Sequence, residues 1–242
     1  MFWFQQGLCA LPAFLGVWSS ATFILSFVIA VLRRDIDIVF PYISDTGANP
    51  PESCFFGLMT FICACAGIGT IYARYKFVEK LIEDQNVVCS GLNTTALVFG
   101  MFSCLGMSVV ATFQETTVTI GHDVGAIMFF VSGVLYTIFQ CLISHKGHPY
   151  DCSKYVFGIR VGIMVVALVT LFPTVICAII CARFGGQSTM HWDKDNELYP
   201  LHLASAICEW IVAFSFVFFF FTYIHDFKRF TLQVTTVYEQ LH

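Results

Sequence analysis

Residues 201–224 read LHLASAICEWIVAFSFVFFFFTYI, and His202 and Glu209 are the only acidic, basic or histidine residues in this apolar run. A bilayer core of about 30 Å is crossed by about 20 helical residues. The run lacks the alternation of polar and apolar residues that is typical of a membrane β-strand. Because lipid cannot hydrogen-bond backbone N–H and C=O groups, we expect residues 201–224 to form a membrane-spanning α-helix.

Five more apolar segments of similar length precede this run, near residues 11–32, 54–73, 94–113, 120–143 and 156–182. The whole chain is 57% hydrophobic and 12% charged, whereas soluble domains are about 45–50% apolar and about 25% charged. The six segments and the short connections between them use almost all of the 242 residues, which leaves no room for a separate soluble domain. The sequence therefore predicts an all-α integral membrane protein, a single six-transmembrane-helix bundle over residues 1–224 with a short tail at 225–242.

Lys and Arg residues set the expected orientation, because they accumulate on the cytosolic side of membrane proteins. With a cytosolic N-terminus, eight basic residues are cytosolic: Arg74, Lys76, Lys80, Lys146, Lys154, Arg160, Lys228 and Arg229. Four lie on the opposite side: Arg33, Arg34, Arg183 and Lys194. Both termini are therefore predicted to be cytosolic, although Arg33 and Arg34 flank the first span on the other side. The glycosylation sequon at Asn93 is cytosolic in this topology and lumenal in the inverted one.

The connection between the first two spans, PYISDTGANPPES at residues 41–53, contains the Asp-Thr-Gly tripeptide of aspartic proteases. Such a protease needs two Asp carboxylates a few ångströms apart that share a proton. The tripeptide occurs once here, and Asp123 is the only Asp within a span. We therefore interpret the tripeptide as part of a rigid turn, in which Asp45 bonds the main chain two residues further on and Gly47 supplies a positive φ. The Glu52 carboxylate then complements the positive end of the second span.

Four ionisable residues inside the spans define the candidate site: His122, Asp123, His202 and Glu209. Such residues are costly in lipid and usually face a bundle interior or a water-filled cavity. All four fall in the half of the bundle away from the cytosol, together with Asp45, Glu52 and Glu115. The pattern predicts a polar vestibule formed by His122, Asp123, His202, Glu209, Asp45 and Glu52. A His–carboxylate network that only fixes helix packing explains the same residues, so both interpretations stay open.

Patterns typical of enzymes are missing from the sequence. It contains no nucleophile elbow and no glycine-rich phosphate loop, and no HExxH or HxxxH spacing that would place two zinc ligands on one helical face. We therefore predict no catalytic residue, no metal, no cofactor and no nucleic-acid partner, and we do not expect an enzyme.

The tail contains Tyr238-Glu239-Gln240-Leu241, which has the tyrosine-x-x-bulky-apolar form that sorting adaptors read for delivery to endosomes and lysosomes. It follows the last span on the side where such adaptors act. Tyr238 and Leu241 are therefore predicted to form a sorting motif, with sorting adaptors as partners.

Several stretches, in order along the chain, resemble the damage-regulated autophagy modulator (DRAM) family: Trp18-Ser19-Ser20-Ala21, PYISDTG at 41–47, Arg74-Tyr75-Lys76, Phe113-Gln114 and Cys208-Glu209-Trp210. The PYISDTG loop and the Glu-Trp pair are the most specific parts. The opening residues 3–8 look closest to the second of the two vertebrate members. Thr112 departs from the Asn that the family usually has before Phe113-Gln114.

The resemblance implies a six-span lysosomal membrane protein that promotes autophagy and can feed into apoptosis, without a known reaction. Membrane lipids and autophagy-related membrane proteins are the partners that it implies. The wider superfamily includes lipid-remodelling factors for GPI anchors, so the alternative is a lipid-handling protein, for remodelling or transport, that uses the His, Asp and Glu cluster. A cavity that reaches Glu209 would favour this alternative, and a dry, fully paired cluster would favour a scaffold.

Overall fold

The computed structural model describes residues 7–184 and 190–229, which are mostly helical. Six helices are long and apolar enough to cross a membrane. They are α1 (Ala10–Arg33), α2 (Glu52–Gln85), α3 (Ser90–Thr112), α4 (Thr119–Gly147), α5 (Lys154–Phe184) and α6 (Tyr199–Phe221). Shorter helical turns are η2 (Gly7–Cys9), η3 (Asp45–Gly47) and α7 (Tyr223–Phe227). No strand occurs in the described ranges, and the predicted all-α membrane fold with six spans is confirmed.

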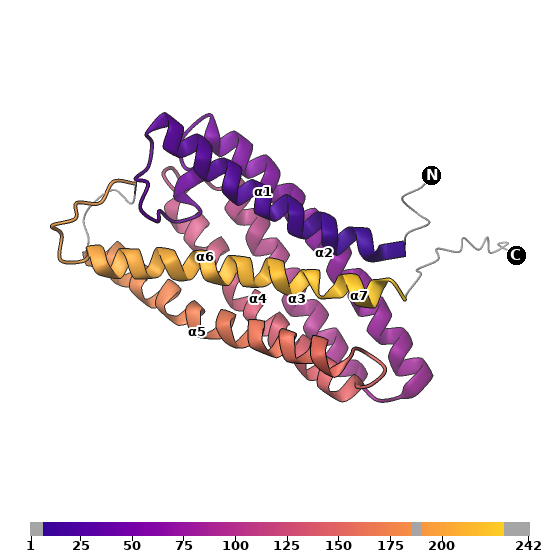
Figure 1. Ribbon diagram of the computed structural model, residues 1–242. Coiled ribbons are helices and arrows are strands. Elements are labelled where there is room, and N and C mark those ends of the chain that lie inside the picture. The colour runs from indigo at the N-terminus through magenta and orange to yellow at the C-terminus, as the bar shows by residue number, and fades with distance from the viewer. Residues whose placement is uncertain (1–6, 185–189, 230–242) are drawn as a thin grey trace, which may run out of the picture.

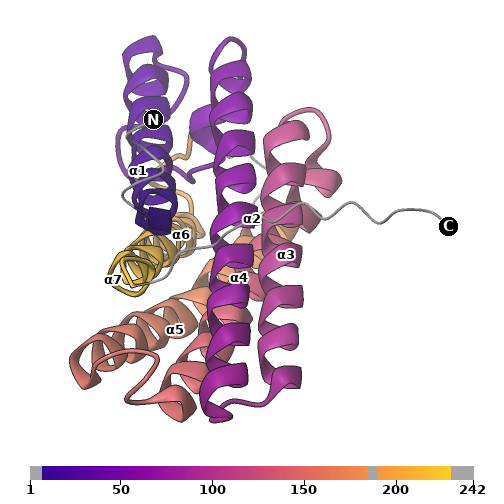
Figure 2. The ribbon, with the colours of Figure 1, turned by 90° about the vertical axis from the view of Figure 1, so that its right-hand side faces the viewer.

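The helices lie side by side in one bundle (Figure 1). The start of α1 and the end of α7 lie at one end of it, which we call the terminal end, together with the connections 86–89 and 148–153. The connections 34–51, 113–118 and 190–198 form the opposite end, which we call the loop end. α5 is inclined to α2 and α3 (Figure 2) and packs mainly along α6, with much less of its surface against α4.

Local sequence explains several helix boundaries. α1 ends at Arg33 because Arg34 adopts the left-handed conformation, with a φ of 64°. α2 ends at Gln85, where Asn86 takes a φ of 51°, and Asn tolerates this helix-ending conformation better than most residues. α6 has Pro200 in its first turn, where the missing N–H would have had no partner within the helix.

Two glycines allow α3 and α4 to approach each other closely. A Cβ atom on Gly106 would lie 2.5 Å from the backbone nitrogen of Phe129, and a Cβ atom on Gly125 would lie 2.7 Å from Cγ1 of Val109. Small residues at such positions let the backbones of membrane helices pack directly. The first contact is with main chain, so a side chain at position 106 would push the two helices apart.

The outward faces of the helices carry large apolar side chains. Val17 of α1 is 65% exposed, Leu105 of α3 is 53% exposed and Val169 of α5 is 62% exposed. Leaving such side chains outside is favourable only where the surroundings are lipid, since lipid tails are as apolar as the side chains themselves. The exposure pattern thus agrees with a membrane-embedded bundle.

The orientation of the bundle stays a prediction, but the structure changes the charges on which it rests. Arg74 and Arg160 are fully buried, which leaves six of the eight basic residues near the surface of the terminal end. On the other side, Arg33 forms an ion pair with the buried carboxylate of Glu52. Asn93 is buried and donates from Nδ2 to the carbonyl oxygen of Tyr75 at 3.0 Å, so the folded sequon is inaccessible in either orientation.

Candidate functional site

The PYISDTG loop at residues 41–47 is bound to α6 by two hydrogen bonds to consecutive residues. The backbone N–H of Ile43 donates to Oε2 of Glu209 at 3.0 Å, and Nε1 of Trp210 donates to the carbonyl oxygen of Pro41 at 2.9 Å. The two most specific stretches of the sequence are therefore in direct contact. Glu209 is 8% exposed and lies ten residues into α6, which is about 15 Å from the helix start at 1.5 Å per residue.

The Asp-Thr-Gly tripeptide forms the turn η3 within this loop. Oδ2 of Asp45 accepts a hydrogen bond from the backbone nitrogen of Tyr42 at 3.1 Å. This main-chain contact lies three residues before Asp45, whereas the sequence predicts one two residues after it. The predicted positive φ at Gly47 is wrong, because among the described glycines only Gly7 has a positive φ. Glycine is needed here for space: a Cβ atom on Gly47 would lie 2.3 Å from the ring of Phe56.

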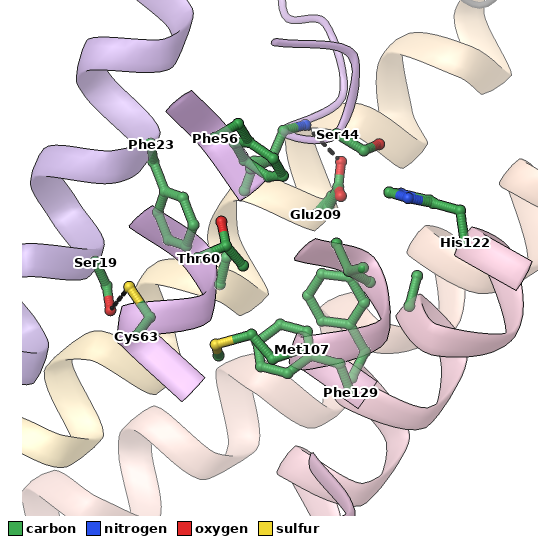
Figure 3. Close-up of a pocket in the computed structure, with 15 residues that line it drawn as sticks. Ser19, Phe23, Ser44, Phe56, Thr60, Cys63, Met107, His122, Phe129 and Glu209 are labelled. Carbon is green, nitrogen blue, oxygen red and sulfur yellow. Dashed lines mark hydrogen bonds between the residues drawn. The ribbon is translucent and has the colours of Figure 1, made fainter. Parts of the chain in front are cut away.

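Glu209 lines a cavity inside the bundle, which we call the interior cavity (Figure 3). Its volume is about 50 Å³, well below the range of about 300–1,000 Å³ that is usual for small-molecule sites. Its wall is mainly apolar and includes Phe23, Phe56, Met107, Phe129 and Phe130. Its polar groups include Ser44, Thr60, His122 and Glu209.

His122, near the start of α4, points toward Glu209 (Figure 3). Its Nδ1 atom lies 2.7 Å from the carbonyl oxygen of Phe113. Because a carbonyl oxygen only accepts hydrogen bonds, Nδ1 of His122 carries a proton. His122 is 4% exposed, so its ring lies inside the bundle rather than on the lipid-facing surface.

A second cavity, the lateral groove, lies between α4 and α5. Its volume is about 280 Å³, and it is open to the outside. Its sides include Thr119, Asp123 and Ile127 of α4 and Thr174, Ala178 and Ala182 of α5. The lateral groove and the interior cavity share Ser44, His122, Ala126, Phe130 and Glu209. His122 and Glu209 thus lie between an apolar cavity inside the bundle and a groove on its side.

The lining of the lateral groove contains acidic side chains as well as neutral polar ones. It includes the carboxyl groups of Glu115, Asp123 and Glu209, whereas no Lys or Arg of the described chain lines the groove or the interior cavity. Burial raises the pKa of Glu115, although the charge of His122 acts in the opposite direction. When these carboxyl groups are ionised, the groove has a negative potential that attracts cations.

The structure brings part of the predicted vestibule together. His122 and Glu209 share both cavities, and Asp123 lines the lateral groove. Asp45 is buried in the loop that covers Glu209. Whether these residues serve a ligand or only the packing of the helices stays a prediction.

The other predicted residues lie elsewhere. The ring of His202 stacks on Trp192 with ring centres 4.5 Å apart and belongs to a separate pocket at the loop end. Glu52 is buried beside Arg33 and lines neither the lateral groove nor the interior cavity. The predicted sorting motif lies outside the described residues, at Tyr238 and Leu241.

A second polar centre, which the sequence analysis missed, lies at the terminal end. This ion-pair cluster consists of Arg74, Asp151, Arg160 and Asp226, all completely buried. Arg74 Nη2 lies 2.8 Å from Asp151 Oδ1, and Arg74 Nη1 lies 3.2 Å from Asp226 Oδ2. Arg160 pairs with the same two carboxylates. The cluster joins α2, the connection 148–153, α5 and α7 with balanced charges.

Neutral groups satisfy the other guanidinium donors of the ion-pair cluster. Arg74 Nε donates to Oε1 of Gln140 at 3.1 Å. Arg160 Nε donates to Oγ1 of Thr222 at 2.9 Å, and Arg160 Nη1 donates to Oγ of Ser144 at 2.8 Å. A buried ion pair is tolerated only when its remaining donors are bonded in this way.

The sequence did contain a signal for the ion-pair cluster. Arg160 falls inside the predicted span 156–182, and a charge within a span needs a partner. The predicted orientation counts Arg160 and Arg74 among the cytosolic basic residues, but both side chains are buried. Burial alone would raise the pKa of Asp151, but the charges of these two arginines hold that pKa below its ordinary value.

Comparison with known proteins decides the family. The Frag1/DRAM/Sfk1/Cwh43P N-terminal domain family matches residues 7–230. The chain belongs to this family. The resemblance to DRAM proteins that the sequence predicted is therefore confirmed. No solved structure matches the chain.

Several relatives within the Frag1/DRAM/Sfk1/Cwh43P family are similar over almost their whole length. DNA damage-regulated autophagy modulator protein 2 of Mus musculus is 42% identical over 97% of this chain and 89% of its own. Protein 1 of the same name from Homo sapiens is 42% identical over 98% of both chains. The modulator of macroautophagy TMEM150B of Danio rerio is 29% identical over 95% of this chain and 90% of its own. Proteins 1 and 2 are both 42% identical to this chain, so overall identity does not indicate which of the two it resembles more.

Proposed function

We propose that this chain is a multi-pass protein of the lysosomal or endolysosomal membrane that promotes autophagy and can feed into apoptosis, without catalysing a reaction. The observation that carries this proposal is the similarity of 97–98% of the chain, at 42% identity, to proteins named autophagy modulators. Such a match covers all six spans and the loops between them. The relatives' function is therefore assigned to the whole bundle.

The contacts of the candidate site support a role without catalysis. A Ser, Thr or Cys nucleophile needs a base within hydrogen-bonding distance. Among the described residues, His122 bonds a backbone carbonyl and His191 bonds Asp37, and neither bonds such a nucleophile. Glu209 instead bonds the backbone of the loop at 41–47.

The autophagy role is tested in cells from which the protein has been removed. We expect the delivery of a cytosolic reporter to lysosomes to fall at least twofold, and re-expression of the wild-type chain to restore it. Unchanged delivery in the absence of the protein would contradict the proposal.

The lysosomal location is tested separately through the tail. Replacing Tyr238 by Ala is expected to lower the share of the protein in isolated lysosomes, because sorting adaptors then lose one of the two fixed residues of the motif. Tyr155→Ala is a matched control, since Tyr155 is 78% exposed at the same end of the bundle. Equal lysosomal shares for the two variants would dismiss the motif.

A second function, the handling of membrane lipids, is favoured by the lateral groove. The groove opens between α4 and α5 and reaches Glu209 inside the bundle, so a lipid can enter from the bilayer without crossing water. A scaffold tolerates Glu209→Gln, because the shape and the hydrogen bond to Ile43 are kept. A lipid-handling protein loses its effect on the lipid composition of isolated lysosomes with this variant, although the variant is expressed normally.

A further inference from the structure

The pocket that contains the ring of His202, which we call the loop-end pocket, lies between the connections 34–51 and 190–198. Its volume is about 530 Å³, within the range of about 300–1,000 Å³ that is usual for small-molecule sites. Hydrogen bonds join the two connections, which meet at the loop end in Figure 1. The backbone nitrogen of Asp37 donates to the carbonyl oxygen of Met190 at 3.3 Å, and the backbone nitrogen of Trp192 donates to Oδ2 of Asp37 at 3.2 Å. The fold therefore holds the walls of this pocket together.

The charged side chains that line the loop-end pocket leave a surplus of positive charge. Arg34 and Lys194 line it and form no ion pair within the described residues. The carboxylate of Asp37 also lines it, but that group already bonds the backbone nitrogen of Trp192 and lies 3.3 Å from Nδ1 of His191. The exposed acidic residues of the connection 190–198 are not part of the described lining: Asp193, Asp195 and Glu197. The pocket therefore attracts an anion.

His202 has a buried nitrogen atom in this pocket that lacks a hydrogen bond. Its side chain is 4% exposed, and its Nδ1 atom has no partner among the described residues. The ring is held by Trp192, which stacks on it, and by Tyr42, which meets it edge to face with ring centres 5.0 Å apart. A buried polar atom without a partner is costly. Because an imidazole nitrogen that carries a proton is a donor, an acceptor ligand in the pocket removes this cost.

The outer wall of the loop-end pocket is apolar and faces away from the bundle. Ile38 and Val39 line the pocket and are exposed, and Leu32 in the last turn of α1 is exposed beside them in the sequence. Such side chains are stable on the outside where lipid tails surround them. Basic and aromatic residues near the ends of spans lie at the level of the lipid head groups. The pocket is therefore at the boundary between lipid tails and water, where the phosphate groups of phospholipids are found.

We propose that the loop-end pocket binds the phosphate group of an anionic glycerophospholipid from the adjoining leaflet. The planar guanidinium group of Arg34 matches two phosphate oxygens, Lys194 adds a second positive charge, and Nδ1 of His202 donates from inside the pocket. The acyl chains stay in the bilayer beside Ile38 and Val39. A soluble phosphate compound shares the phosphate chemistry but lacks the contact with this apolar wall.

This site goes beyond the functions proposed above, because it is separate from the residues on which they rest. Arg34, Lys194 and His202 line neither the lateral groove nor the interior cavity. The site also gives Arg34 a role on the side of the membrane where the predicted orientation places fewer basic residues.

Competition on the full-length wild-type protein in detergent micelles tests the head group. The probe is phosphatidylglycerol with a fluorophore on one acyl chain, and empty micelles measure its partition into detergent. We expect saturable binding that unlabelled phosphatidylglycerol displaces. Phosphatidylcholine is expected to compete at least fivefold more weakly, because its trimethylammonium group brings a positive charge toward Arg34 and Lys194. Equal competition by the two lipids, or binding no greater than that to empty micelles, would overturn the proposal.

Glycerophosphoglycerol, which is the same head group without acyl chains, separates a lipid from a soluble phosphate compound. We expect it to compete at least a hundredfold more weakly than phosphatidylglycerol. Equal competition by the two compounds would overturn the assignment to a lipid and would show that the pocket takes a soluble phosphate compound.

Arg34→Gln tests the charge contact. We expect this variant to lower the affinity for phosphatidylglycerol at least fivefold. Arg183→Gln is the matched control, because Arg183 is also an exposed cation at the loop end but is not part of the described lining of the pocket. The affinity of this control should stay within twofold of that of the wild type. Equal losses in the two variants would show a general attraction to surface charge and would contradict a site in the pocket.

Two variants of His202 test the hydrogen bond inside the pocket. His202→Phe keeps a ring that can stack on Trp192 but cannot donate, so we expect the affinity to fall at least threefold. His202→Gln keeps a donor, so its loss should be smaller. High salt screens exposed charges, and it should reduce the effect of Arg34→Gln but not that of His202→Phe. Unchanged affinity in a folded His202→Phe variant would overturn the proposal, and the wild-type competition decides if that variant does not fold.

Discussion

Ile43 and Glu209 are 166 residues apart in the chain and are joined by a hydrogen bond of 3.0 Å from a backbone N–H to a carboxylate oxygen. This bond holds the loop at 41–47 over α6. The same carboxylate lines both the interior cavity and the lateral groove. A ligand that contacts Glu209 therefore contacts the group that anchors the loop.

Replacing Glu209 by Ala is expected to lower the free energy of unfolding by about 1–3 kcal/mol, because the N–H of Ile43 is left buried without its acceptor. Glu209→Gln keeps an acceptor oxygen in place, so we expect a smaller loss. Thermal unfolding of the purified variants in detergent measures the loss of stability caused by each of the two substitutions. Trp210→Phe, which removes the hydrogen bond to Pro41 and part of the ring surface that packs on α1 and α6, serves as a comparison at the same loop. Equal stability of the Ala and Gln variants would show that the bond does not anchor the loop.

Removing one charge from the ion-pair cluster is expected to be more damaging. Arg160→Met leaves two buried carboxylates with a single guanidinium group, and breaking such a pair costs about 3–5 kcal/mol. Adding Asp226→Asn to Arg160→Met restores the charge balance, so we expect the double variant to lose less than the sum of the two single variants.

Lys80→Met is the control for the ion-pair cluster. Lys80 also pairs with carboxylates on α2, but it is exposed, and exposed pairs contribute little to stability. Unfolding temperatures in detergent should therefore be unchanged by Lys80→Met and clearly lowered by Arg160→Met. A loss of similar size in both variants would contradict a special role for the buried cluster.

Glu115 is expected to make stability depend on pH. Burial raises its pKa above the ordinary value of about 4.3. A carboxyl group with a raised folded-state pKa contributes stability that is fully present below the unfolded pKa and is lost as the pH rises through the folded-state pKa. The wild-type protein should thus lose stability from acidic toward neutral pH, and Glu115→Gln should reduce this loss.

Unfolding temperatures of the wild type and Glu115→Gln, compared at about pH 5 and about pH 7.5, measure the effect of Glu115. Glu197→Gln is the matched control, because Glu197 is exposed at the same end of the bundle. If the wild type and Glu115→Gln respond equally to pH, the buried carboxyl group is not the cause.

The sequence was sufficient for the six spans because an apolar run of membrane length has few alternatives. It did not reveal how far α2 extends beyond the predicted span 54–73. The helix continues to Gln85, where Lys80 pairs with Glu83 and Asp84 on its surface. Such i,i+3 and i,i+4 pairs support a polar helix, but they add nothing to the hydropathy by which the span was recognised.

The candidate site was only partly predictable for a different reason. Glu209 and His122 stand out as ionisable residues in apolar segments, and the structure places them in one cavity. His202 stands out equally, yet it lies in another pocket because Trp192, from the connection before α6, stacks on it. The partner of Glu209 is the backbone N–H of Ile43, a group that every residue except Pro possesses, so no side-chain pattern identifies it.

Both termini are expected to face the cytosol, and this orientation decides which compartment meets the acidic side chains of the lateral groove. The absence of a glycan at Asn93 does not report on it, because Asn93 is buried in the folded chain, whereas a glycan there would invert the predicted topology. Two epitope tags report on the orientation, one placed after residue 242 and the other inserted between Asp193 and Lys194. The second position accepts a tag because both of these residues are exposed at the loop end. After selective permeabilisation of the plasma membrane, antibody should reach the first tag only. Access to the second tag alone would invert the bundle and place Glu115 and Asp123 on the cytosolic side.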